Sequence, residues 1–150
     1  NAFLVKTLNK WAFSYTQKIY SQKKIYLFDT GLKTLLTGKQ DLGFKAENAI
    51  FIHLVKQNLS LGYFAEAKKE VDFIIGGKKN PLPIEVKYVE KLTMDDKRLS
   101  GLLLFLNRFS KAKKAVVVTK SFEKEENYRK TKIKFIPLWQ FLFYSLTENK

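Results

Sequence analysis

Two short stretches separated by a glycine-containing break constrain the fold of this chain more than any other feature. The first covers residues 70–75, the second covers residues 81–88, and Gly76-Gly77-Lys78-Lys79-Asn80 lies between them. Apolar and polar residues alternate in both stretches, as in strands, and glycine readily adopts the positive φ that a tight return requires. The sequence therefore predicts a β-hairpin over residues 70–88.

Charged residues share one face of this predicted hairpin. Side chains two residues apart point to the same face of a strand, so Glu70 lies with Asp72, and Glu85 lies with Lys87. A turn centred between residues 78 and 79 would place Asp72 opposite Glu85, and Glu70 opposite Lys87. Two close carboxylates repel each other unless a cation lies between them, which suggests a hard metal ion bound by oxygen ligands. Ordinary surface ion pairs on a polar sheet face are the alternative interpretation.

The periodicity of the flanking sequence predicts further helices and strands. Apolar residues recur at helical spacing over residues 46–59 and 95–109, and Pro137 opens a closing helix through Phe143. Strand patterns cover residues 61–67, 115–119 and 132–136, and the β-branched run at 115–119 is typical of a fully buried strand. Residues 120–132 are predicted to form a charged loop or a frayed helix start. The predicted order is α-β-β-β-α-β-β-α, an α/β domain.

Residues 1–46 are predicted to form a lead-in to this domain. The loose alternation within residues 1–28 fits two strands, which can form a ribbon packed on another element. Asp29 or Thr30 can cap a short helix through Leu36 that ends at Gly38. Because the chain begins with Asn1 and not with methionine, we expect a fragment of a longer protein.

Glu47 is the unusual residue of the predicted helix 46–59. Its neighbours three, four and seven positions on are Ile50, Phe51 and Leu54, so its carboxylate projects from the edge of an apolar face. A first-turn acid stabilised by the helix dipole is one interpretation. A third carboxylate directed at the hairpin site is the other.

The composition excludes several function classes. The chain has no cysteine, which excludes disulfides and thiolate zinc sites and is compatible with the cytoplasm. Its one histidine, His53, cannot by itself make a histidine metal site or a Ser-His-Asp triad. No apolar run approaches the length of a membrane span, and the N-terminus does not resemble a signal peptide. No feature of the sequence indicates an oligomeric state.

The net charge of +14 on 150 residues predicts attraction to a polyanion, with nucleic acid ahead of a membrane surface. Lys and Arg outnumber Asp and Glu by 8 to 2 over residues 1–46 and by 14 to 6 over residues 91–150, whereas residues 47–90 hold 6 of each. A solvated lysine-rich surface explains the charge equally well. The residues predicted to contact a DNA backbone are Lys78, Lys79, Arg108, Lys111, Lys113 and Lys114.

Several segments carry a resemblance to a known family. A helix with Glu47, a strand with Asp72 and a next strand with Glu85-Val86-Lys87 follow each other in the order of the restriction-endonuclease-like PD-(D/E)XK core. Residues 24–32 (KIYLFDTGL), 47–51 (ENAIF), 70–74 (EVDFI) and 84–87 (IEVK) resemble the nuclease-like C-terminal domain of AAA+ type ATPases of archaea and bacteria. Val71 stands where the family motif has proline.

This resemblance implies a restriction-endonuclease-like mixed sheet flanked by helices over residues 47–150. It implies that Asp72 and Glu85 hold Mg²⁺ or Mn²⁺ with the Val86 carbonyl, that Glu47 is a third acidic contact, and that Lys87 orients the attacking water or neutralises charge. It also implies that residues 1–30 are the tail of a winged-helix-like connector, that residues 1–46 connect the domain to an ATPase, and that this AAA+ ATPase module precedes Asn1.

Two hypotheses about function follow. The first is metal-dependent hydrolysis of DNA phosphodiesters by a cytoplasmic, nuclease-like domain of a larger ATPase. The second is a catalytically inactive nuclease fold that acts as a DNA-binding or protein-docking module of that ATPase. Salt-dependent DNA binding without metal-stimulated hydrolysis would favour the second hypothesis.

Overall fold

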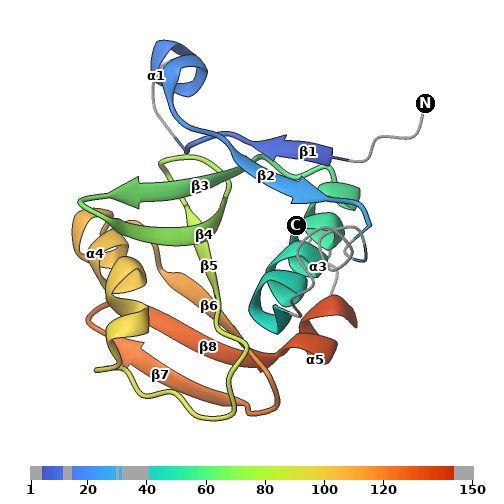
Figure 1. Cartoon of the computed structure of the whole chain (residues 1–150). Helices are drawn as coiled ribbons and strands as arrows, with labels where there is room; N and C mark the ends of the chain where they lie inside the picture. Colours follow the sequence, from blue (N-terminus) through green and yellow to red (C-terminus); the bar gives the residue numbers. More distant parts are fainter. Residues whose placement is uncertain (1–4, 12–14, 30, 32–40, 144–150) are drawn as a thin grey trace.

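A six-stranded mixed sheet with helices on both faces forms the centre of the molecule (Figure 1). The computed structural model describes residues 5–11, 15–29, 31 and 41–143. This architecture confirms the predicted α/β class, a mixed sheet flanked by helices.

The sheet contains parallel strands at its centre and antiparallel strands at its edges. The β5–β6 and β6–β8 pairs are parallel, and the other pairs are antiparallel. The central β6 carries Val117 and Val118, both fully buried, in agreement with its predicted position. Across the sheet the strands are β3 (Leu61–Glu66), β4 (Lys69–Ile75), β5 (Leu82–Val86), β6 (Lys114–Thr119), β8 (Thr131–Pro137) and β7 (Lys124–Tyr128).

The β4–β5 hairpin has the predicted register. The paired residues are Phe73 with Ile84, Ile74 with Pro83 and Ile75 with Leu82, which lies nearest to the turn. This is the register that places Asp72 opposite Glu85. Gly76 opens the turn with a φ of +80°, which an L-residue with a side chain rarely adopts. The turn therefore lies at one end of the two strands, and the acidic residues lie at the other.

The two faces of the sheet bury separate apolar clusters. The helix α4 (Ser100–Arg108), preceded by the 3₁₀ turn Lys97–Leu99, covers one face, and α3 (Leu42–Lys56) and α5 (Leu138–Phe143) cover the other (Figure 1). Leu102 and Phe105 of α4 are fully buried with Val71 of β4. Gly101 lies so close to β4 that a Cβ added there would be 1.9 Å from the Glu70 carbonyl oxygen. The α4–β4 contact is therefore a direct backbone approach.

A two-stranded ribbon, β1 (Val5–Leu8) and β2 (Lys24–Leu27), lies beside the main sheet (Figure 1). It confirms the two strands predicted within residues 1–28, but the helix α1 (Tyr15–Tyr20) between them was not predicted. Backbone hydrogen bonds from Trp11 to Tyr63 and from Tyr63 to Asn9 join the ribbon's end to β3. The predicted short helix through Leu36 lies outside the described residues.

Two predictions of local structure are corrected. Residues 124–128 form the strand β7, where a charged loop or helix start was predicted, so the described order from α3 is α-β-β-β-α-β-β-β-α. β7 is an edge strand with an alternating pattern of partly buried and exposed polar residues, so it lacks the apolar signal that identifies buried strands. The helix α3 begins at Leu42, because the Asp41 side chain caps it by accepting a hydrogen bond from the Phe44 N–H.

Candidate functional site

The candidate site lies where β4 and β5 separate. Their ladder ends at the pair Phe73–Ile84, and beyond it the Val86 N–H donates to the Asp72 carboxylate (Oδ2) at 2.8 Å. Asp72 is 7% exposed and Glu85 is 2% exposed. Two carboxylates, predicted to face each other across the hairpin, are therefore held in a nearly dry environment.

Lys87 is the cation nearest to this carboxylate pair. Its ammonium forms an ion pair with Glu85 Oε1 and lies 3.9 Å from Asp72 Oδ2. Burial would lower the pKa of Lys87, but the carboxylates of Glu85 and Asp72 more than offset it, and the pKa is raised. The lysine therefore carries its positive charge at neutral pH.

Glu85 has an unsatisfied oxygen. Its Oε2 is buried and has no hydrogen-bond partner. Burial, and then the charge of Asp72, raise the pKa of Glu85 to about 8, against the opposing effect of Lys87. An unpartnered buried carboxylate oxygen is costly, because it has lost water without gaining a donor. The ionised form of Glu85 would need a further positive charge beside Oε2.

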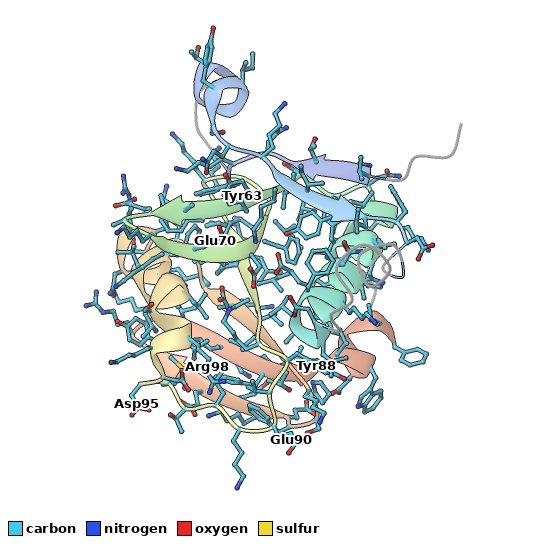
Figure 2. The ribbon with its side chains drawn as sticks, in the orientation of Figure 1. Tyr63, Glu70, Tyr88, Glu90, Asp95 and Arg98 are labelled. Carbon is cyan, nitrogen blue, oxygen red and sulfur yellow. The ribbon has the colours of Figure 1, made fainter. Side chains whose placement is uncertain are left out.

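Lys24 brings a second cation to the same end of the sheet. Its ammonium lies 2.6 Å from Glu70 Oε1, 2.8 Å from Glu47 Oε1 and 3.1 Å from Asp72 Oδ1. Burial would lower the pKa of Lys24, but Asp72 and Glu47 raise it above its ordinary value. The Tyr63 ring lies below this ammonium at 5.8 Å, and Figure 2 shows Tyr63 and Glu70 on the neighbouring strands β3 and β4.

The helix α3 supplies Glu47 and fixes its carboxylate. The Tyr26 hydroxyl donates to Glu47 Oε1 at 2.7 Å, and burial and then Glu47 raise the pKa of that hydroxyl, so it remains a donor. Glu47 lies beyond the first turn of α3, which contains no acidic residue. The helix-dipole interpretation of Glu47 is therefore wrong, and its contacts are with Lys24 and Tyr26.

The structure brings most of the predicted acidic site together. Glu47, Asp72, Glu85, Val86 and Lys87 all lie at the end of β4 and β5 that is remote from the turn. One predicted pair differs, because Glu70 forms its ion pair with Lys24 and not with Lys87. Lys24 and Tyr26 were missed as members of the site. The strand pattern around Lys24 and Tyr26 was visible in the sequence, but nothing local linked these residues to acids far along the chain.

The predicted DNA-contacting residues do not join this site. Lys78 and Lys79 lie in the turn at the opposite end of the hairpin, and both are exposed. Arg108 forms an ion pair with Glu66, and Lys113 donates to the Ser110 carbonyl at 3.1 Å. Two further exposed lysines of this group are Lys111 and Lys114.

Carboxylates are the kind of ligand that a hard cation binds. In this structure, however, the carboxylates form ion pairs with Lys24 and Lys87. Across the residues that the structure describes, no set of three or more Asp, Glu, His or Cys side chains is placed to hold a metal ion. Lys24 occupies the point on which the oxygens of Glu47, Glu70 and Asp72 converge. The observation that favours a metal is the unpartnered Glu85 Oε2, because carboxylate oxygens are the donors that Mg²⁺ prefers.

The fold and site define an α/β domain with a buried, lysine-paired carboxylate cluster at the strand ends. Residues 42–141 match the family described as "Domain of unknown function (DUF4143)". Because the match covers two thirds of the chain, this protein belongs to that family. The family is typically found at the C-terminus of AAA-ATPase-like proteins. A comparison with curated proteins finds no match.

The described helices carry no candidate for a membrane span. None of them is both long enough and apolar enough to cross a bilayer.

Proposed function

We propose that this chain is a PD-(D/E)XK nuclease-like domain of an AAA-type ATPase, which hydrolyses DNA phosphodiesters in the cytoplasm with Mg²⁺ or Mn²⁺. The observation that carries this proposal is the buried pair Asp72–Glu85 with Lys87 beside it and Glu85 Oε2 left without a partner. In buried structural ion pairs both carboxylate oxygens usually have hydrogen-bond partners. A site that awaits a cation would leave one of them open.

Asp72 and Glu85 would hold the ion, with the Val86 carbonyl and Glu47 as the further contacts that the family resemblance implies. When bound, Mg²⁺ or Mn²⁺ polarises a phosphoryl oxygen and lowers the pKa of water. The Val86 N–H orients Asp72 by donating to Oδ2. Lys87 remains charged and lies between the two acids. Its ammonium can stabilise the negative charge that develops on the phosphate during attack.

The net charge of the chain supports DNA as the substrate. A protein with a charge of +14 attracts a polyanion at long range, and its exposed lysines can neutralise backbone phosphates. Lys78 and Lys79 are exposed at the turn, Lys111 lies between α4 and β6, and Lys114 is the first residue of β6. These residues are remote from the acids along the strands, so they would bind a duplex that extends beyond the cleavage site.

Cleavage of supercoiled, branched and single-stranded DNA in Mg²⁺ or Mn²⁺ tests the proposal. Asp72→Ala and Lys87→Ala should each reduce the rate about a hundredfold or more, because each removes a charge from the reacting centre. Glu90→Gln is the matched control, since Glu90 is exposed, pairs with Lys120 and lies well away from Glu70 (Figure 2). Equal rates for the wild type, Asp72→Ala and Lys87→Ala on every substrate would exclude catalysis by this site.

One observation favours the second candidate function, an inactive nuclease fold that binds DNA or docks protein for its ATPase. Lys24 already supplies a cation to Glu47, Glu70 and Asp72. This function predicts salt-dependent DNA binding that is unchanged in Asp72→Asn, with no hydrolysis stimulated by metal. An absence of DNA binding at low salt would leave docking to the ATPase as its remaining form.

A further inference from the structure

Lys24 is unusual because its one ammonium group forms ion pairs with three carboxylates from two elements. Glu47 comes from α3, whereas Glu70 and Asp72 come from β4, and their oxygens lie 2.6–3.1 Å from Nζ. The side chain of Lys24 is 19% exposed, so water screens these contacts only in part. Convergent oxygens around one positive charge are also the arrangement that a hard metal ion requires.

Two contacts between β2 and the helix α3 hold the strand that carries Lys24. The Asn48 side chain is fully buried and bonds to both backbone polar groups of Leu27: its amide donates to the carbonyl, and its Oδ1 accepts from the N–H at 2.8 Å. The Tyr26 ring stacks on Phe51 of α3 with centroids 4.0 Å apart. These contacts fix β2 against α3. The strand that carries Lys24 is therefore held beside the acids by the fold, and the Lys24 ammonium reaches them from there.

Asp72 connects the Lys24 contacts to the unpartnered oxygen of Glu85. One of its oxygens faces Lys24, and the other accepts from the Val86 N–H and faces Lys87. A metal ion shared by Asp72 and Glu85 would lie close to the Lys24 ammonium. The two cations would repel each other and compete for the same carboxylate.

We propose that Lys24 determines whether the acidic site accepts a divalent metal ion. This inference rests on the proposed function, because it concerns the same Asp72–Glu85 site. In the structure Lys24 provides the positive charge, and removing it frees oxygens for Mg²⁺ or Mn²⁺. Lys24 lies on the lead-in ribbon, outside the residues 42–141 that match the family. Displacement of the ribbon would therefore remove the Lys24 ammonium from the carboxylates, at the expense of the contacts that β2 makes with Asn48 and Phe51 of the family domain.

Titration calorimetry with Mn²⁺ on the whole 150-residue chain tests this inference. Lys24→Ala should bind Mn²⁺ about tenfold or more tightly than the wild type, a difference of about 1.4 kcal/mol or more. Lys23→Ala removes the same charge from the neighbouring, exposed position and should bind like the wild type. Lys24→Arg retains the charge and should not gain affinity.

Thermal unfolding keeps the test decisive if Lys24→Ala folds poorly without metal. Mn²⁺ should raise the Tm of Lys24→Ala, or of the longer Lys24→Gln, more than it raises that of the wild type, because binding to the folded state stabilises it. Equal Mn²⁺ binding by the wild type, Lys24→Ala and Lys24→Gln would overturn the role of Lys24 but leave the metal site intact. An absence of Mn²⁺ binding in every variant would overturn the metal-dependent function, and this inference with it.

Discussion

At the scale of single residues, Glu85 is the more deeply buried of the two paired carboxylates at the site. It is 2% exposed, one of its oxygens has no partner, and its pKa is raised to about 8. Desolvation, together with the nearby negative charge of Asp72, outweighs the opposing effect of Lys87 on the pKa of Glu85. The carboxyl is therefore mostly protonated at neutral pH unless a cation is added beside it.

The pH dependence of stability should show this shift. The unfolded chain loses the Glu85 proton near its ordinary pKa of 4.5, whereas the folded chain keeps it to about 8. The contribution of Glu85 to stability is therefore lost as pH rises through this window, by at most about 1.4 kcal/mol per pH unit. Urea unfolding of the wild type and Glu85→Gln in a chelating buffer from pH 5 to pH 8 measures the difference. Parallel curves for the two proteins would contradict the assignment.

The members of the site differ in how far the sequence reveals them. Asp72, Glu85 and Lys87 could be placed together because strand alternation and a short turn fix their register locally. Lys24 could not, since its contact with Asp72 joins residues 48 positions apart and depends on how β2 packs against α3. The packing is set by the buried Asn48, whose role is invisible without the fold.

At the scale of elements, the attachment of β2 to α3 depends on that asparagine. Asn48→Ala would leave the N–H and carbonyl of Leu27 without their side-chain partners. We expect a loss of about 1–3 kcal/mol in the free energy of unfolding by urea. Hydrogen exchange at the Leu27 amide should also become faster. Asn127→Ala, at an exposed position of the edge strand β7, is the control and should change stability by no more than about 0.5 kcal/mol. Equal stability for both variants would contradict this role of Asn48.

A second prediction at this scale concerns the packing of α4 on β4. A Cβ at position 101 would lie 1.9 Å from the Glu70 carbonyl oxygen, which is backbone and cannot move without distorting β4. Gly101→Ala should therefore destabilise the protein by about 3 kcal/mol in urea unfolding. Gly77→Ala is the control, because nothing lies within 4 Å of its added Cβ. A change at Gly101 as small as that at Gly77 would show that α4 does not approach β4 so closely.

Most elements could be predicted because they bury an apolar face, and the exceptions lack one. The strand β7 is an edge strand of alternating partly buried and exposed polar residues, in which Glu125 forms an ion pair with Lys132 of β8. A turn in which Arg129 has a φ of +55° joins β7 to β8, and the two strands pair in the antiparallel direction. Such a strand is stabilised mainly by its ladder, so the sequence carries no periodic signal for it.

At the scale of the whole molecule, the carboxylate cluster of the site and the exposed lysines of the β4–β5 turn lie apart. The carboxylates lie at one end of β4 and β5, and the turn with Lys78 and Lys79 lies at the other end. If the chain binds DNA as proposed, affinity should fall with salt, because phosphate contacts release counterions. The acids are paired locally, so the remaining positive charge faces outward over the rest of the surface.

DNA binding by paired lysine variants tests that charge arrangement. Lys78→Ala with Lys79→Ala, and Lys111→Ala with Lys114→Ala, should each weaken binding and reduce the slope of log K against log salt by about 2. Fluorescence anisotropy over a range of salt concentrations gives both quantities. Glu125→Gln should not weaken binding. Unchanged slopes for both lysine pairs would exclude these two surfaces as backbone contacts.

The central claim is that Asp72 and Glu85 form the metal site of this domain. Anomalous X-ray scattering from a crystal of Lys24→Ala grown with Mn²⁺ tests it most directly. We predict an anomalous peak in contact with the carboxylates of both Asp72 and Glu85. An absence of any peak between these two residues at saturating Mn²⁺ would contradict the account.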